Sequence, residues 1–197
     1  MDEKERKAFE GDAQAQCDMG DDYFFEAFDA DIEDKDVLYR KAIYWYHRAA
    51  QKGHAASQYN LAYQYEHGLG IEIDLEQAVY WYLRAANQGY GAAENNLGHL
   101  YETGCGLPQD WELAAHWYYE AAMAGDGPAQ NNLGVLYRDG HGVRHDLCQA
   151  AYWFAQSAAS GYKEGMKNYA RALEKGEGVE KDTVEAAYWR QKGNEQD

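Results

Sequence analysis

Two short motifs in the sequence suggest chemistry, and each lacks a part that the chemistry needs. Ser160-Gly161-Tyr162-Lys163 has the Ser-x-x-Lys spacing in which a lysine activates a nucleophilic serine in penicillin-recognising enzymes. The accompanying Ser-Asp-Asn and Lys-Thr-Gly motifs do not occur in the sequence. Gly-x-Gly pairs such as Gly140/Gly142 could cradle a phosphate, but neither a third glycine nor Gly-Lys-Ser/Thr follows them. We therefore predict no catalytic residue and no enzymatic activity.

Two groups of side chains could hold a metal ion. His141, His145 and Cys148 are of the types that bind zinc, but two of them fall in a turn and no fourth ligand is evident. Residues 29–36 look like the start of a calcium loop. However, the glycine that this loop needs at its sixth position is missing, and Arg40 stands where it needs glutamate. We predict neither a metal site nor a cofactor.

Acidic and aromatic side chains alternate in residues 21–36, which hold eight acids and one base. One interpretation is a solvated loop that its aromatic residues pin to the fold. The other is a contact surface for a basic partner, because exposed aromatic residues beside charges are common at interfaces. The residues of this acidic-aromatic patch are Asp21, Asp22, Phe24, Phe25, Phe28, Asp29 and Asp31.

An internal repeat of 36 residues must position all of these groups. Five tryptophans are spaced at this interval: Trp45, Trp81, Trp117, Trp153 and Trp189. The period predicts an N-terminal capping half-repeat at 1–11, a first repeat with the insertion at 12–53, repeats at 54–89, 90–125 and 126–161, and a truncated capping repeat at 162–197. Because such units bury apolar surface only against their neighbours, we predict one solenoid domain.

Each repeat is predicted to form two helices joined by a turn. Ala129, Leu133 and Tyr137 show the helical spacing that marks a first helix. The Gly-x-Gly pair then supplies residues with positive φ that end this helix. An aspartate begins the second helix in four repeats: Asp74, Asp110, Asp146 and Asp182. In all but the Asp110 repeat, a Gln or Glu three residues later predicts a capping box, and the fold class is all-α.

Composition limits the functional classes. Only 28 of 197 residues are Leu, Ile, Val or Phe and the net charge is −16, which warns of disorder, but the chain also has 18 Tyr and 6 Trp. The acidity argues against nucleic-acid binding, which needs clustered Lys and Arg. No apolar run reaches the roughly 18 residues of a membrane span. With three widely separated cysteines and no visible signal peptide, we expect a cytoplasmic protein that does not bind membranes.

The repeat carries the residue pattern of a known family. Residues 126–161 contain Ala129, Leu133, Gly134, Tyr137, Gly140, Gly142, Val143, Asp146, Ala150, Trp153 and Gly161. This pattern covers about residues 12–193 and closely resembles the Sel-one-like repeat, a relative of the tetratricopeptide repeat. The resemblance implies an α/α superhelical solenoid that serves as a protein-binding scaffold. Members of the family act as adaptors in complex assembly, signalling and contacts between bacteria and hosts.

The resemblance also implies a concave binding face, lined by the first helix of each pair. At helical spacing beside the buried stripe, this face predicts ten partner-binding residues: Tyr59, Tyr63, Glu66, Asn95, His99, Glu102, Asn131, Arg138, Lys167 and Arg171. Asparagine recurs at a neighbouring position, either as a buried structural residue or as a clamp on a peptide backbone: Asn60, Asn96, Asn132 and Asn168. We expect a protein or peptide partner, and a basic sequence is one option for it.

Two functions fit these features. The first is an interaction scaffold or adaptor that binds its partner on the concave face. The second is a neutraliser, such as an immunity protein or inhibitor, whose acidic surface covers a basic toxin or enzyme. Residues 1–40 hold 14 acids and 5 bases, so −9 of the total charge of −16 lies in this segment. A third hypothesis, a hydrolase of the β-lactam type, rests only on Ser160 and Lys163.

Overall fold

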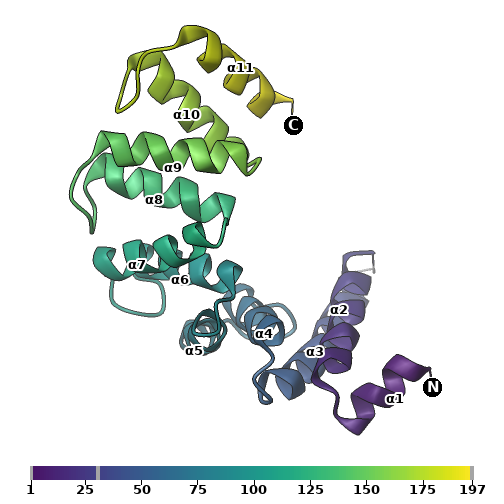
Figure 1. Cartoon of the computed structure of the whole chain (residues 1–197). Helices are drawn as coiled ribbons and strands as arrows, with labels where there is room; N and C mark the ends of the chain where they lie inside the picture. Colours follow the sequence, from purple (N-terminus) through teal and green to yellow (C-terminus); the bar gives the residue numbers. More distant parts are fainter. Residues whose placement is uncertain (1, 30–31, 196–197) are drawn as a thin grey trace. The chain divides into compact units, whose positions relative to one another are not determined.

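The described part of the chain is helical throughout. The computed structural model describes residues 2–29 and 32–195, which form eleven helices and no strand (Figure 1). The helices are α1 Glu3–Glu10, α2 Ala13–Asp29, α3 Ile32–Ala50, α4 Ala55–His67, α5 Leu75–Ala86, α6 Gly91–Thr103, α7 Trp111–Met123, α8 Gly127–Asp139, α9 Leu147–Ala159, α10 Lys163–Lys175 and α11 Thr183–Asn194. Within the described residues, none of these helices is long and apolar enough to cross a membrane.

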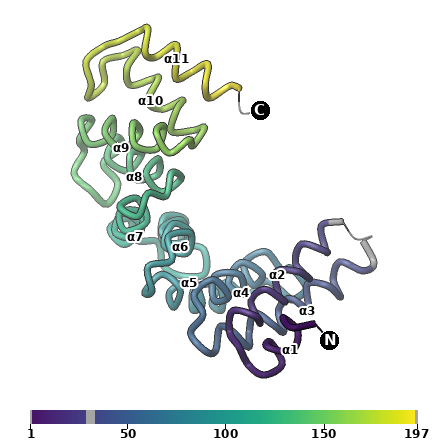
Figure 2. Tube along the Cα trace, turned by 45° about the vertical axis from the view of Figure 1, so that its right-hand side comes forward, coloured from purple at the N-terminus to yellow at the C-terminus, as the bar shows by residue number. Residues whose placement is uncertain are grey.

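The helices pack as pairs within two compact units. The first unit comprises Met1–Ala93 with Cys105–Leu107, and the second comprises Glu94–Gly104 with Pro108–Asp197. In the first unit each helix from α1 to α4 packs against the next one along the chain, and α2 and α3 run side by side (Figure 2). In the second unit, the same holds for each helix from α7 to α10. The predicted all-α fold of helix pairs is confirmed.

The glycine pairs form the predicted turns. Gly140 ends α8 with φ 72°, and Gly142 follows with φ 66°. The second glycine of the pair also lies against backbone, since a Cβ built on Gly142 would stand 2.0 Å from the carbonyl oxygen of Trp111. On Gly178 it would stand 1.8 Å from the carbonyl oxygen of Leu147. These turns therefore need glycine both for the left-handed backbone and for the close approach of the preceding repeat.

Each predicted capping box consists of two hydrogen bonds. The bond to the aspartate side chain forms, and the prediction of the second bond, from the aspartate N–H to the Gln or Glu side chain, is wrong. The side chain of Asp146 accepts hydrogen bonds from the backbone N–H groups of Cys148 and Gln149, as expected for an N-cap. Its own backbone N–H donates to the carbonyl oxygen of Tyr137 at 2.9 Å, and Asp74 and Asp182 use theirs in the same way. Because the first helix of the repeat already satisfies this donor, the Gln or Glu side chain is not needed there.

Small residues and large aromatic rings form the core together. Tyr82 and Tyr118 are fully buried, and so are the alanines Ala78 and Ala114 on the same helices. The ring of Tyr118 lies on Gly98, where an added Cβ would stand 2.6 Å from a ring carbon. Each buried aromatic removes about 150–250 Å² from water, which offsets the shortage of Leu, Ile and Val.

The acidic insertion is helical, so the solvated-loop interpretation is wrong for its described residues. Its extra residues lengthen α2 to 17 residues and α3 to 19, whereas α4 to α11 have 12 or 13. Phe24 and Phe28 are one helical turn apart on α2, and their rings pack edge to face. Asp31 and the side chain of Asp29, both predicted members of the patch, lie outside the described residues.

Candidate binding site

A pocket of about 300 Å³ lies in the first unit, between α2, α3 and α4. Its lining residues are Asp21, Phe24, Phe25, Phe28, Tyr46, Tyr59, Asn60 and Tyr63. The pocket brings together two groups that are separate in the sequence. Asp21 and the three phenylalanines belong to the predicted acidic-aromatic patch, whereas Tyr59 and Tyr63 belong to the predicted partner-binding face.

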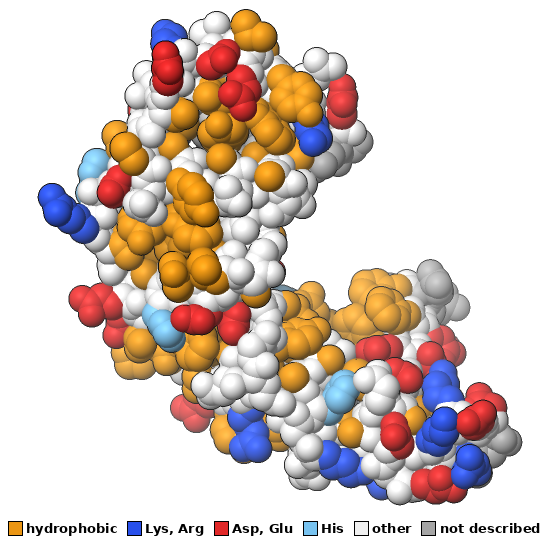
Figure 3. Space-filling model, in the orientation of Figure 1, with side chains coloured by type: hydrophobic (Ala, Val, Ile, Leu, Met, Phe, Trp, Pro, Cys, Tyr) orange, Lys and Arg blue, Asp and Glu red, His pale blue; other side chains and the backbone are white. Residues whose placement is uncertain are grey.

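Aromatic rings form most of the pocket wall. The ring centroid of Phe24 lies 5.5 Å from that of Phe28 and 6.4 Å from that of Tyr63, both in edge-on arrangements. Tyr63 in turn lies 6.4 Å from Tyr59. Phe25 is 65% exposed and Phe28 is 60% exposed, which is unusual for phenylalanine. Apolar side chains accordingly gather on the surface beside the end of α2 (Figure 3).

Asp21 is the charged residue of this pocket, and neighbouring side chains hold it in place. Its Oδ1 accepts hydrogen bonds from the hydroxyl of Tyr46 at 2.7 Å and from Nδ2 of Asn60 at 3.1 Å. Burial, together with the bond to Asp21, raises the pKa of Tyr46, which keeps its hydroxyl protonated as a donor. Burial also raises the pKa of the Cys17 thiol to about 11. That thiol lies 3.9 Å from Oδ2 of Asp21.

Two acids of the predicted face belong to related pairs inside the fold. Glu66 accepts a hydrogen bond from the hydroxyl of Tyr82 at 2.7 Å, and Glu102 accepts one from Tyr118 at 2.6 Å. Both acids are half-buried. The sequence signal for this structural pair is the 36-residue spacing that the tyrosines and the glutamates share.

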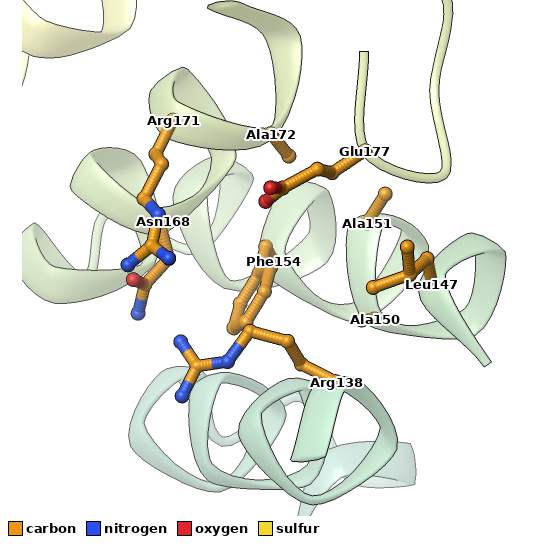
Figure 4. A pocket seen from close by; sticks show the side chains of 9 residues that line it. All are labelled: Arg138, Leu147, Ala150, Ala151, Phe154, Asn168, Arg171, Ala172 and Glu177. Carbon is orange, nitrogen blue, oxygen red and sulfur yellow. The ribbon is translucent and has the colours of Figure 1, made fainter. Parts of the chain in front are cut away.

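In the next repeat of the second unit, arginine and phenylalanine replace the glutamate and tyrosine of this pair. Arg138 stands 36 residues after Glu102, and Phe154 stands 36 residues after Tyr118. Arg138 donates from Nε and Nη2 to the two carboxylate oxygens of Asp139, at 2.7 Å each. It lines a narrow pocket with Phe154 and Arg171 in which both guanidinium groups point toward the side where Asn168 lies (Figure 4). The substitution therefore exchanges an acidic acceptor for a basic donor.

The predicted asparagines of the face link neighbouring repeats. Asn132 donates to Oδ1 of Asn95 at 3.2 Å, and Asn168 donates to Oδ1 of Asn131 at 2.7 Å. Asn131 is only 7% exposed. The structure therefore gives Asn95 and Asn131 a role in holding α6, α8 and α10 together.

The other predicted contact residues differ in exposure. His99 and Arg171 are exposed, and Arg171 makes no hydrogen bond or ion pair with another described residue. Lys167 is half-buried and pairs with Glu164 at 2.7 Å. In the first unit, Asp22 of the patch is exposed and pairs with Lys4.

The serine of the Ser-x-x-Lys motif is held by hydrogen bonds within the fold. The single proton of the Ser160 hydroxyl lies between two acceptors, Oε1 of Gln130 at 2.8 Å and the carbonyl oxygen of Gln156 at 3.0 Å. These bonds join the end of α9 to α8 within one repeat, which gives the serine a structural role. Within residues 2–29 and 32–195, no group of three His, Cys, Asp or Glu side chains is arranged to hold a metal ion.

A family model and two similar solved structures indicate the same family. The family model for Sel1 repeat, the Sel-one-like repeat, matches residues 13–54, 55–90, 91–126, 127–162 and 163–197. No curated protein matches the chain. A Sel1 repeat protein from Oxalobacter formigenes is 31% identical with a TM-score of 0.82, and the alignment covers 94% of this chain and 72% of that protein.

A second solved structure is similar over a shorter part of its length. It is c5321, a protective antigen present in uropathogenic Escherichia coli strains that displays the same repeat fold. It is 29% identical with a TM-score of 0.78, and the alignment covers 98% of this chain and 48% of that one. The chain thus spans about half of that antigen. Together these matches confirm the predicted solenoid fold.

Proposed function

The chain belongs to the Sel1 repeat family, whose members generally mediate protein–protein interactions, and we propose that it binds a partner protein or peptide on the face formed by the first helices of its repeats. Family scaffolds of this kind are typically non-enzymatic. The proposed role is therefore recognition and assembly, without a chemical step.

The pocket in the first unit is the observation that carries this proposal. It opens on the first helices α2 and α4, and Tyr59 and Tyr63 of the predicted face line it. Aromatic side chains are enriched at protein interfaces, and they contribute a large share of binding energy when a partner covers them. The exposure of Phe25 and Phe28 means that a partner would remove substantial apolar surface from water there.

The acidic N-terminal segment supports the neutraliser as a second candidate. In residues 1–40, 14 acids outnumber 5 bases, and four of those bases already pair with acids of the same segment. Lys4, Arg6, Lys7 and Arg40 form these pairs. The remaining acids would attract a basic protein over long range, with an association rate that falls steeply as salt is added.

Substitutions on the proposed face should weaken binding of a partner recovered by affinity capture. We expect Tyr63→Ala and Arg171→Glu each to raise the dissociation constant about tenfold or more, because truncating a contacting aromatic or arginine residue often costs over 1 kcal/mol. His99→Ala should have a smaller effect in the same direction. Calorimetry with the purified partner measures these changes, with the circular dichroism of each variant as a folding check.

Val184→Ala is the matched control. Val184 is 81% exposed on α11, a second helix, and should leave the affinity unchanged. If all three face variants bound like the original protein, the assignment of the face would be wrong. A dissociation constant that rises strongly between 50 and 300 mM salt, with little effect of Tyr63→Ala, would favour the neutraliser.

A further inference from the structure

The pocket in the first unit combines aromatic walls with one carboxylate, and none of its eight lining residues is basic. We propose that it binds a single arginine side chain of the partner, with the guanidinium group stacked among the rings and facing Asp21. This inference rests on the proposed function, which it deepens by naming the side chain that is recognised.

Asp21 has acceptor capacity left for such a cation. Its Oδ1 takes the two strong donors, from Tyr46 and Asn60. Its Oδ2 has the thiol of Cys17 at 3.9 Å, and a thiol is a weak donor. An ionised carboxylate offers about four acceptor sites over its two oxygens. Hydrogen bonds from Tyr46 and Asn60 fix the orientation of the group, so that a ligand need not order it.

The aromatic walls suit a cation for a separate reason. The face of an aromatic ring is electronegative and attracts a positive charge placed within about 6 Å of its centre. Elsewhere in this unit the chain already uses this contact, with Lys41 over Tyr23, and with Arg48 and Arg84 over tyrosines of their own helices. Among the described residues no lysine or arginine lies over Phe24 or Phe28, whereas the imidazole of His67 stacks on one face of Tyr63 with 4.0 Å between the ring centroids.

Size and charge select the occupant. A volume of about 300 Å³ is at the lower end for ligand pockets, which fits one long side chain rather than a large organic molecule. An apolar side chain would desolvate Oδ2 of Asp21 and give it no donor. Arginine is favoured over lysine because its planar, weakly hydrated guanidinium both stacks on rings and donates to a carboxylate.

Titration of the full chain with a small probe tests this inference without the partner. The probe is Nα-acetyl-arginine amide, and its neutral control is Nα-acetyl-citrulline amide, which has nearly the same shape. Aromatic NMR signals of Phe-labelled protein report on Phe24, Phe25 and Phe28 directly. We expect saturable shifts with a dissociation constant in the millimolar range, and binding of the citrulline compound at least tenfold weaker.

Two neighbouring carboxylates provide matched variants. Asp21→Asn keeps an oxygen for Tyr46 but removes the charge, and should weaken probe binding at least tenfold. Asp22→Asn removes an exposed charge next to it, which pairs with Lys4, and should have little effect. Phe28→Leu, at a side chain that is 60% exposed, should weaken binding several-fold without unfolding the chain.

Equal binding of the arginine and citrulline compounds would overturn the inference, and so would equal effects of Asp21→Asn and Asp22→Asn. Shifts that do not saturate would also overturn it. Its failure is distinct from failure of the proposed function. Loss of partner binding in Tyr63→Ala and Arg171→Glu without specific probe binding leaves the interaction face in place and removes the arginine pocket. Specific probe binding, with no effect of the face variants on partner binding, would support the arginine pocket and overturn the proposed interaction face.

Discussion

Replacing Gly142 by alanine should lower the free energy of unfolding by about 3–5 kcal/mol. Two costs add at this position. The backbone has φ 66°, a region that non-glycine residues adopt with strain. The new Cβ would also stand 2.0 Å from the carbonyl oxygen of Trp111, which belongs to the start of α7 and cannot move without breaking the helix end. Urea denaturation followed by circular dichroism measures the loss.

Gly161→Ala separates the two costs. Gly161 also has a positive φ, of 89°, but a Cβ there would meet no atom within 4 Å. The backbone strain alone should cost about 1–2 kcal/mol. If the two variants were equally stable, the close approach of Gly142 to Trp111 at the start of α7 would not contribute to the stability of the repeat junction.

Stability should fall steeply with rising pH above about 10, because of the buried tyrosine–acid pairs. Burial, and then the hydrogen bonds to Asp21 and Glu102, raise the pKa values of Tyr46 and Tyr118 in the folded chain. In the unfolded chain both tyrosines titrate near pH 10. Their stabilising effect is thus complete below that pH and is lost above it, by about 1.4 kcal/mol per pH unit for each tyrosine.

Tyr118→Phe tests the origin of this loss. At pH 8 the variant should be less stable by about 1–3 kcal/mol, because half-buried Glu102 loses its donor. Between pH 10 and 11, however, its stability should fall less steeply than that of the original chain, since one titrating group is gone. Urea denaturation at pH 8, 10 and 11 measures both the loss of stability at pH 8 and the slope of stability with pH between 10 and 11. The same alkaline slope in both proteins would show that other groups cause the loss.

The fold could be predicted from the sequence because the same helix-pair pattern recurs in five repeats. The recurring Trp, the glycine pairs and the aspartates each specify a local structure that neighbouring repeats confirm. The acidic insertion occurs once, so no second copy showed that its residues would lengthen α2 and α3. The capping boxes failed for a different reason. The backbone N–H of Asp146 has a tertiary partner, the carbonyl oxygen of Tyr137, which local sequence patterns do not reveal.

The candidate site was predictable in its parts but not in its assembly. Phe24 and Tyr63 were both selected from the sequence, in separate groups. Their meeting in one pocket depends on how the lengthened α2 packs beside α4, which is tertiary information. Helical spacing also placed Glu66 and Asn131 on the binding face, although the structure gives them intramolecular partners. Spacing identifies a face of a helix, whereas exposure depends on what the next repeat covers.

Site-specific photo-crosslinking in the cells that produce the protein tests the central claim most directly. p-Benzoylphenylalanine at position 63, in place of Tyr63, lies in the wall of the proposed pocket. The same group at position 184, in place of Val184, lies exposed on a second helix. Binding through the first-helix face predicts a covalent adduct with one partner protein from position 63 and none from position 184. An adduct from position 184 alone, or equal yields from both positions, would contradict it.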